Sequence, residues 1–236
     1  MKALFLFVVL SSLWLGSQAQ KKKSKDNPVW FNLEVKGGIG TSLLSNKNIS
    51  GDENINAMNF NFYPAYGIGI GAHIKNYFAV QIEKSWSSFG QKYTYKNESP
   101  ARTLVFNSSE MGLFLRKTSE GGGFVGLGFK VANISKSNVD SISVYSKSLN
   151  FLNFEIGGPV WQNNMFDINL NIRFGYGLNN MVSAENYNPG AYTVYTKNAT
   201  THPITAQFLI GFNWHVGYWA TSNCKHKGFV FFLSNS

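Results

Sequence analysis

The chain has a single cysteine and, beyond its N-terminus, no long apolar run. Cys224 is the only cysteine among 236 residues, so an internal disulfide is excluded. No later segment supplies the roughly 20 consecutive apolar residues that a membrane-spanning helix needs. Any insertion into a bilayer must therefore use strands.

Charge is also scarce. Charged residues make up 14% of the chain and aromatic residues 16%, a balance that suits a protein in contact with both lipid and water. Lys and Arg outnumber Asp and Glu by 21 to 12, but Lys21, Lys22 and Lys23 fall in what should be a solvated leader. No basic stripe alternates with stacking aromatics on one strand face, so nucleic acid is not an expected partner.

The N-terminus is typical of an export signal. Lys2 precedes an apolar run from Ala3 to Leu15, and Ser17-Gln18-Ala19 places small residues where a signal peptidase cuts. We therefore expect a signal peptide at 1–19, a periplasmic leader at 20–29, one barrel domain at 30–215 and a C-terminal tail at 216–236. No cysteine follows the expected cut, which argues against a lipid-modified N-terminus.

A two-residue period runs through most of the chain. In residues 166–178 every second residue, from Phe166 to Leu178, is apolar, and the residues between them are polar or Gly. Such a segment is a strand with one apolar and one polar face. Seven other segments share this pattern: 31–43, 66–74, 78–86, 110–116, 125–131, 152–157 and 206–214.

The connections between these segments alternate in length. The short ones are 75–77, 117–123 and 159–165, and the long ones are 44–64, 87–103, 132–148 and 179–203. Short periplasmic turns and long external loops are typical of outer-membrane barrels. The sequence therefore predicts an all-β fold, an eight-stranded antiparallel up-and-down transmembrane β-barrel in the cell outer membrane, with both termini periplasmic.

The two faces of each strand predict which side meets lipid. A soluble lipocalin-like barrel would place the apolar rows inside, whereas a membrane barrel places them outside. Gly67, Gly69 and Gly71 in one polar row favour the membrane version, because glycine lets side chains crowd a narrow interior. The charged residues predicted to face the lumen are Glu34, Lys36, Glu83, Glu110, Arg116, Lys130, Glu155, Asp167 and Arg173.

These inward charges are close to balanced, which predicts a network of ion pairs that plugs the barrel, since charges away from bulk water need partners. The alternative is that they lie in trapped water. Outward aromatics are predicted to form two interfacial girdles, made of Phe31, Phe78, Phe166 and Trp214 at the periplasmic ends and Tyr66, Trp86 and Tyr176 at the outer ends. Lys84 shares this outward row and is expected to extend toward the outer rim.

Three segments resemble the PorT-like, "porin family" outer-membrane β-barrel proteins of Bacteroidetes-type bacteria: Leu170–Leu178, Gly37–Gly40 and Gln81–Glu83. The resemblance implies an eight-stranded outer-membrane barrel without catalytic residues, and PorT itself is associated with protein secretion. The chain departs from the family in its end, because residues 216–236 continue past the eighth strand and include the apolar segment Gly228–Leu233.

Signals of chemistry are weak. Gly67–Gly71 lies in a strand pattern rather than before a helix, so it is not a phosphate loop. The four histidines, including His202, lack metal-ligand spacing, and His202 with Ser183 or Glu185 is the only faint acyl-chemistry set. We expect no enzyme, metal or cofactor. The expected role is structural or narrow-channel; the alternative is binding of a periplasmic or extracellular protein or small ligand by the loops or tail.

Overall fold

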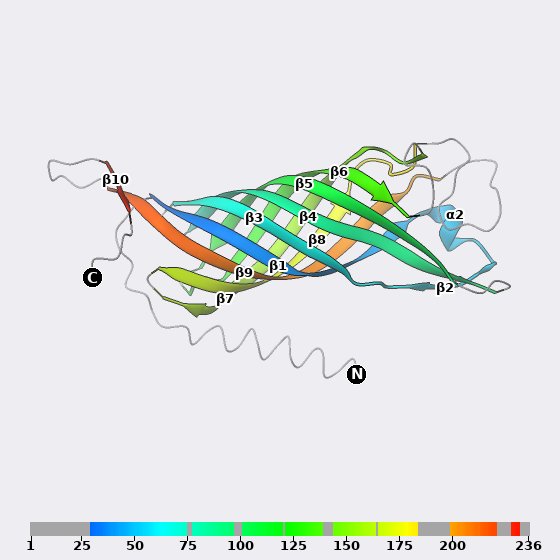
Figure 1. Cartoon of the computed structure of the whole chain (residues 1–236), viewed down its shortest axis with the longest axis horizontal. Coiled ribbons are helices and arrows are strands. Elements are labelled where there is room, and N and C mark those ends of the chain that lie inside the picture. The colour runs from blue at the N-terminus through cyan, green and yellow to red at the C-terminus, as the bar shows by residue number, and fades with distance from the viewer. Residues whose placement is uncertain are drawn as a thin grey trace.

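The computed structural model describes residues 29–74, 77–96, 101–119, 121–138, 144–163, 165–183, 199–220 and 228–231, and the predicted signal peptide lies outside them. This part of the chain forms ten strands and one short helix (Figure 1). Their bounds are β1 Val29–Ser45, α2 Lys47–Ser50, β2 Ile55–Asn59, β3 Tyr63–Ile74, β4 Phe78–Tyr95, β5 Arg102–Thr118, β6 Phe124–Ser137, β7 Ser148–Gln162, β8 Phe166–Gly177, β9 His202–Ala220 and β10 Gly228–Phe231.

Eight of these strands form a closed antiparallel ring. The order is β1-β3-β4-β5-β6-β7-β8-β9, and β9 pairs back with β1 over the whole length of β1. Closure satisfies the backbone groups that an open sheet edge would expose to lipid. The predicted eight-stranded barrel is confirmed. The other two strands lie outside the ring: β2 pairs with the end of β4, and β10 pairs with the last residues of β9.

The two ends of the barrel differ. At one end, which we call the short-turn end, the connections are residues 75–77, 119–123 and 163–165, and both Val29 and Ala220 lie there. The opposite, long-loop end carries α2 and β2, as Figure 1 shows, with β10 at the far side of the molecule. The tail segment 228–231 thus adds a short strand beside β9, which itself continues past the predicted barrel boundary at residue 215.

The predicted loop at 87–103 is wrong. Strand β4 continues to Tyr95 and β5 begins at Arg102, so only residues 96–101 connect them. The two-residue period persists in this segment, but its polarity is reversed. Phe89, Tyr93 and Tyr95 face inward and are buried. A search for outward apolar rows therefore does not detect it.

Within the span of the apolar rows, side chains alternate strictly between the two faces of the wall. Val35, Leu115 and Leu127 point outward and are 59–61% exposed, whereas Glu34 and Glu155 point inward and are 1% and 0% exposed. Apolar surface outside and charge inside is the arrangement of a membrane barrel. None of the helices that the structure describes is long and apolar enough to cross a membrane.

Candidate functional site in the lumen

Eight of the nine charged residues predicted for the lumen are buried inside the barrel, and Asp167 lies half-buried at the short-turn end. They reach the lumen because each occupies the inward position of its strand. Alternation places Glu34 and Lys36 of β1, two residues apart, on the same face.

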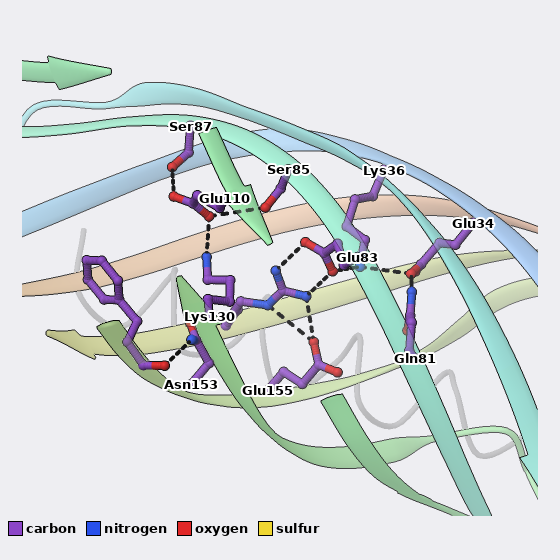
Figure 2. Close-up of polar contacts among 12 residues, drawn as sticks. Glu34, Lys36, Gln81, Glu83, Ser85, Ser87, Glu110, Lys130, Asn153 and Glu155 are labelled. Atoms are coloured by element: carbon purple, nitrogen blue, oxygen red, sulfur yellow. Dashed lines mark hydrogen bonds and ion pairs between the residues drawn. The ribbon is translucent and has the colours of Figure 1, made fainter. Parts of the chain in front are cut away.

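Six of these residues form a closed cycle of alternating charge, which we call the charge ring: Glu34, Lys36, Glu83, Arg173, Glu155 and Arg116. Figure 2 shows the side chains of Glu34, Lys36, Glu83 and Glu155 pointing toward one another inside the barrel. The ring holds three acids and three bases, so its formal charge is zero. Each charge has an opposite charge on both sides, and this mutual attraction offsets the large cost of removing the ions from water.

The acidic members of the charge ring each bridge two bases. Lys36 Nζ lies 2.8 Å from Glu34 Oε2 and 2.7 Å from Glu83 Oε2. Arg173 donates two 2.8 Å hydrogen bonds to the carboxylate of Glu83 and one of 2.9 Å to Glu155 Oε2. On the remaining side, Arg116 Nε lies 2.5 Å from Glu155 Oε1, and its Nη2 lies 3.7 Å from Glu34 Oε2.

Aromatic rings support the two guanidinium groups. Arg173 Cζ lies 4.2 Å from the centroid of the Phe114 ring, and Arg116 Cζ lies 4.4 Å from that of Phe124. Both rings face the lumen, where the sequence analysis expected only polar side chains. Cation–π contacts of this kind hold a guanidinium plane in place, so the two phenylalanines restrict where Arg173 and Arg116 can move.

Glycines in the inward rows provide the space for these groups. Gly128 pairs directly with Phe114 across β5 and β6, and a Cβ at Gly128 would overlap the Phe114 ring. A Cβ at Gly69 would lie 2.6 Å from Gln81 Nε2, and Gln81 in turn donates to Glu34. The glycine-rich rows thus let large side chains lie flat against the wall of a narrow barrel.

A second ion pair lies toward the long-loop end. Lys130 Nζ donates to Glu110 Oε2 over 2.5 Å, and the same carboxylate accepts from Ser85, Ser87 and Ser108 over 2.6–3.1 Å. Figure 2 shows Lys130 and Glu110 beside the charge ring. Four donors satisfy Glu110, so this cluster is again neutral and fully engaged.

The remaining predicted lumen residue, Asp167, belongs to a separate group at the short-turn end. Asp167 Oδ2 lies 2.8 Å from His215 Nε2. The indole of Trp30 stacks between His73 and His215, with centroid distances of 3.5 and 4.8 Å. These rings occupy the short-turn mouth of the lumen. The sequence offered no sign that the two histidines flank the same indole, since they are distant in the chain.

Above the charges, an apolar cluster fills the long-loop end, and sequence reasoning missed it. This outer cap comprises Leu44, Ile49, Phe89, Tyr93, Tyr95, Leu104, Phe106, Ala132, Ile134, Tyr145, Leu149, Phe151, Met181 and Val182. Phe106 is fully buried, with its ring centroid 4.6 Å from Tyr145 and 5.5 Å from Phe89. The reversed polarity of residues 89–95 was the signal that could have revealed it.

Segments between the strands also contribute to the outer cap. Helix α2 places Ile49 in it, and the side chain of Asn46 caps the helix by accepting from the backbone N–H of Asn48 and Ile49. Tyr145 and Val182 form a bridge between the two later connections. Parts of the predicted external loops therefore fold into the mouth of the barrel rather than lying free above it.

The predicted girdle residues lie near the ends of the apolar belt. Tyr66 and Trp86 are cross-strand partners with ring centroids 5.7 Å apart, and Phe166 pairs with Trp214. Tyr66, Phe78, Tyr176 and Trp214 are exposed, and Phe31, Trp86 and Phe166 are half-buried. The seven thus line the outer wall.

The faint acyl-chemistry candidates are engaged in other contacts. Ser183 Oγ donates to the Val144 carbonyl over 2.8 Å, and His202 Nδ1 lies 2.8 Å from the Gly177 carbonyl oxygen. Glu185 lies outside the described residues. Within the described ranges, no group of three His, Cys, Asp or Glu side chains converges on a common point.

No family model and no curated protein matches the chain. Among solved structures, the chain is similar to the outer membrane protein OprG of Pseudomonas aeruginosa, with 12% identity, a TM-score of 0.49 and coverage of 80% of this chain and 97% of that one. It is also similar to Neisserial surface protein A, with 11% identity, a TM-score of 0.43 and coverage of 78% and 96%. It is similar as well to the outer membrane protein AlkL, with 11% identity, a TM-score of 0.42 and coverage of 84% of this chain and 95% of that one.

The closed ring, the outward apolar rows and the buried charges lead to one conclusion about the molecule. Apolar side chains cover the outside of a ring of eight antiparallel strands, and the charges that the strands carry are paired inside it. This arrangement is stable only where hydrocarbon surrounds the wall. The chain is a small outer-membrane β-barrel protein.

Proposed function

We propose that this protein is a closed barrel with a structural role in the outer membrane, plugged by its own side chains, rather than a diffusion pore. The observation that carries the proposal is the bidentate pair of Arg173 and Glu83, which spans the lumen between β8 and β4. At eight strands a barrel interior is only wide enough for side chains to fill. The PorT-like resemblance is consistent with such a barrel.

Two barriers lie in series along the lumen. The charge ring closes the part nearer the short-turn end, and the outer cap closes the long-loop end. Between them, a cavity of about 10 Å³ is lined by Phe89, Glu110, Lys130, Phe151 and neighbouring residues. This volume holds about one water molecule. Free passage of a solute would require both barriers to open.

We also propose that the barrel is not an enzyme. Ser183 and His202 each contact backbone carbonyl groups rather than one another, which supports the proposal. Incubation of the folded protein with phospholipid and with an ester substrate should give no turnover above that of a Ser183→Ala variant. Turnover that this substitution abolishes would contradict the proposal.

Single-channel recording in planar bilayers tests the closed barrel. The wild type should show no stable conductance steps. Arg173→Ser opens only the charge ring, and Phe89→Ala with Phe106→Ala opens only the outer cap. Each of these two variants should therefore show almost no conductance, whereas the variant that combines all three substitutions should conduct. Leu113→Ala, on the lipid-facing wall, is the matched control. Regular steps from the wild-type protein would overturn the proposal.

A second candidate function, binding of a periplasmic protein, is favoured by β10. This four-residue strand pairs only with β9 among the described strands, so its other edge presents backbone groups to which a partner strand can add. Removal of residues 221–236 should then abolish copurification of a partner from outer-membrane extracts while the barrel still inserts. Retention of the partner by the truncated chain would exclude this role for the tail.

A further inference from the structure

Lys84 occupies an outward position that hydrocarbon should cover. It lies on β4 between Ile82 and Trp86, and its cross-strand partners are Ile68 and Met111. Ile68 and Met111 are 52% exposed, as expected of lipid-facing side chains. A Lys that faces lipid is strongly destabilising at the bilayer midplane and costs little near an interface, so the height of its ammonium group decides how well it is tolerated.

The Lys84 side chain extends toward the long-loop end. Its Nζ donates a 2.6 Å hydrogen bond to Ser109 Oγ and lies 5.8 Å from the centroid of the Trp86 ring. Ser109 pairs with Trp86, two residues beyond the Lys84–Met111 pair. The ammonium group is therefore at the upper edge of the apolar rows, where headgroups begin, and this agrees with the sequence expectation.

Polar side chains continue from this point on the outer wall of β4, β5 and β6. We call them the headgroup patch: Lys84, Ser88, Asn107, Ser109, Asn133 and Lys136. Ser88 Oγ donates to Asn107 Oδ1 over 2.7 Å, and the strand register places Lys136 beside Asn107 and Asn133 beside Ser109. The patch thus combines two ammonium groups with hydroxyl and amide groups on one continuous surface.

The headgroup patch has cations but no carboxylate. Both acids of β4, β5 and β6, Glu83 and Glu110, point into the lumen and are buried there. Among the described contacts, neither Lys84 nor Lys136 forms an ion pair. A cation at the edge of a low-dielectric medium is stabilised by a counter-charge, and the described residues of β4, β5 and β6 provide none on the outer wall.

We propose that the headgroup patch binds the phosphate group of a phosphorylated outer-leaflet glycolipid. The ammonium groups of Lys84 and Lys136 would hold the phosphate, Ser109 and Asn107 would hydrogen-bond the sugar, and the acyl chains would cover Ile82 and Met111. The inference rests on the general placement of long loops outside the cell. It does not depend on whether the lumen conducts.

Native mass spectrometry of the folded protein in dodecyl maltoside tests the proposal. A bis-phosphorylated lipid A should give a one-lipid adduct, whereas the same glycolipid without phosphate and phosphatidylcholine should not. Lys84→Gln with Lys136→Gln should weaken binding about tenfold or more, because both charge-assisted hydrogen bonds to the phosphate are then replaced by weaker neutral ones. Lys84→Arg should retain binding.

Lys117→Gln is the matched control, because Lys117 is an exposed outward residue of the same strand as Ser109 but lies at the short-turn end. It should bind lipid like the wild type. Heat-dependent migration in SDS gels confirms that each variant is folded before titration. Equal binding by the double variant, or equal binding of the dephosphorylated glycolipid, would overturn the proposal.

Discussion

Arg173 and Glu83 join opposite walls of the barrel. The two residues are 90 positions apart in the chain, and their strands, β8 and β4, are four places apart in a ring of eight. Two parallel hydrogen bonds of 2.8 Å connect the guanidinium and the carboxylate. This single ion pair therefore spans the full width of the lumen, and it makes strands that share no backbone pairing depend on each other.

Removal of Arg173 should destabilise the barrel strongly. In Arg173→Met the carboxylate of Glu83 keeps only Lys36 and that of Glu155 keeps only Arg116. Breaking a buried ion pair by removing one partner costs about 3–5 kcal/mol. Urea unfolding in detergent should show a decrease of this size in the free energy of unfolding. Glu83→Gln in the same chain should recover part of it, since the uncompensated charge is then absent; purely additive effects would show that the two residues are not coupled.

Gly128 should tolerate no side chain while Phe114 is present. A Cβ at this position would overlap the Phe114 ring, and overpacking of this kind costs typically about 1–3 kcal/mol. Gly128→Ala should lower the free energy of unfolding by that amount, and Phe114→Leu in the same chain should reduce the effect. Gly37→Ala is the matched control, because no atom lies within 4 Å of the added Cβ. Equal effects at Gly37 and Gly128 would contradict the packing argument.

The sequence predicted the strands that face lipid because two solvents act on them. From Phe166 to Gly177 successive residues face opposite sides of the wall, the lumen and the lipid. Polar and apolar residues therefore alternate along the sequence with a period of two. The same rule identified the inward charges. It could not identify their partners, because whether Arg173 meets Glu83 or Glu110 depends on how strands stagger around the ring, and no local pattern encodes that stagger.

The outer cap was missed for a different reason. Residues 89–95 also follow a two-residue period, interrupted by Gln91, but their apolar side chains Phe89, Tyr93 and Tyr95 face inward and belong to the outer cap at the long-loop end. The pattern is that of a soluble barrel rather than of a membrane barrel. Alternation therefore predicts a strand in both cases. Whether the apolar residues occupy the inward or the outward positions indicates which solvent covers the wall at that height.

The outer cap should behave as a packed core. Phe106→Ala removes a fully buried ring that contacts Phe89 and Tyr145, and such a substitution costs about 3–5 kcal/mol. Leu115→Ala, on the lipid-facing wall, should cost far less because lipid fills the space. Urea unfolding of both variants in detergent measures the difference. If the two substitutions were equally destabilising, the apolar residues at the long-loop end would not form a core.

The point at which the C-terminus is truncated should decide whether the barrel closes. Gly217, Tyr218 and Trp219 of β9 pair through their backbone with Phe31, Trp30 and Val29, and this pairing is part of the seam that closes the ring. Deletion of 216–236 removes that part of the seam and leaves the backbone groups of Val29, Trp30 and Phe31 unpaired on the side of β9, and each buried backbone group left without a hydrogen bond costs about 1–3 kcal/mol. Deletion of 221–236 removes β10 alone.

Heat-dependent migration in SDS gels distinguishes the two truncations. The chain ending at Ala220 should show the separate folded and boiled bands of an intact barrel, whereas the chain ending at His215 should show mainly the unfolded band. The full-length chain provides the reference for both. If both truncations migrated like the full-length protein, the pairing of residues 217–219 with β1 would contribute nothing to closure, and the barrel would end at the predicted boundary of residue 215.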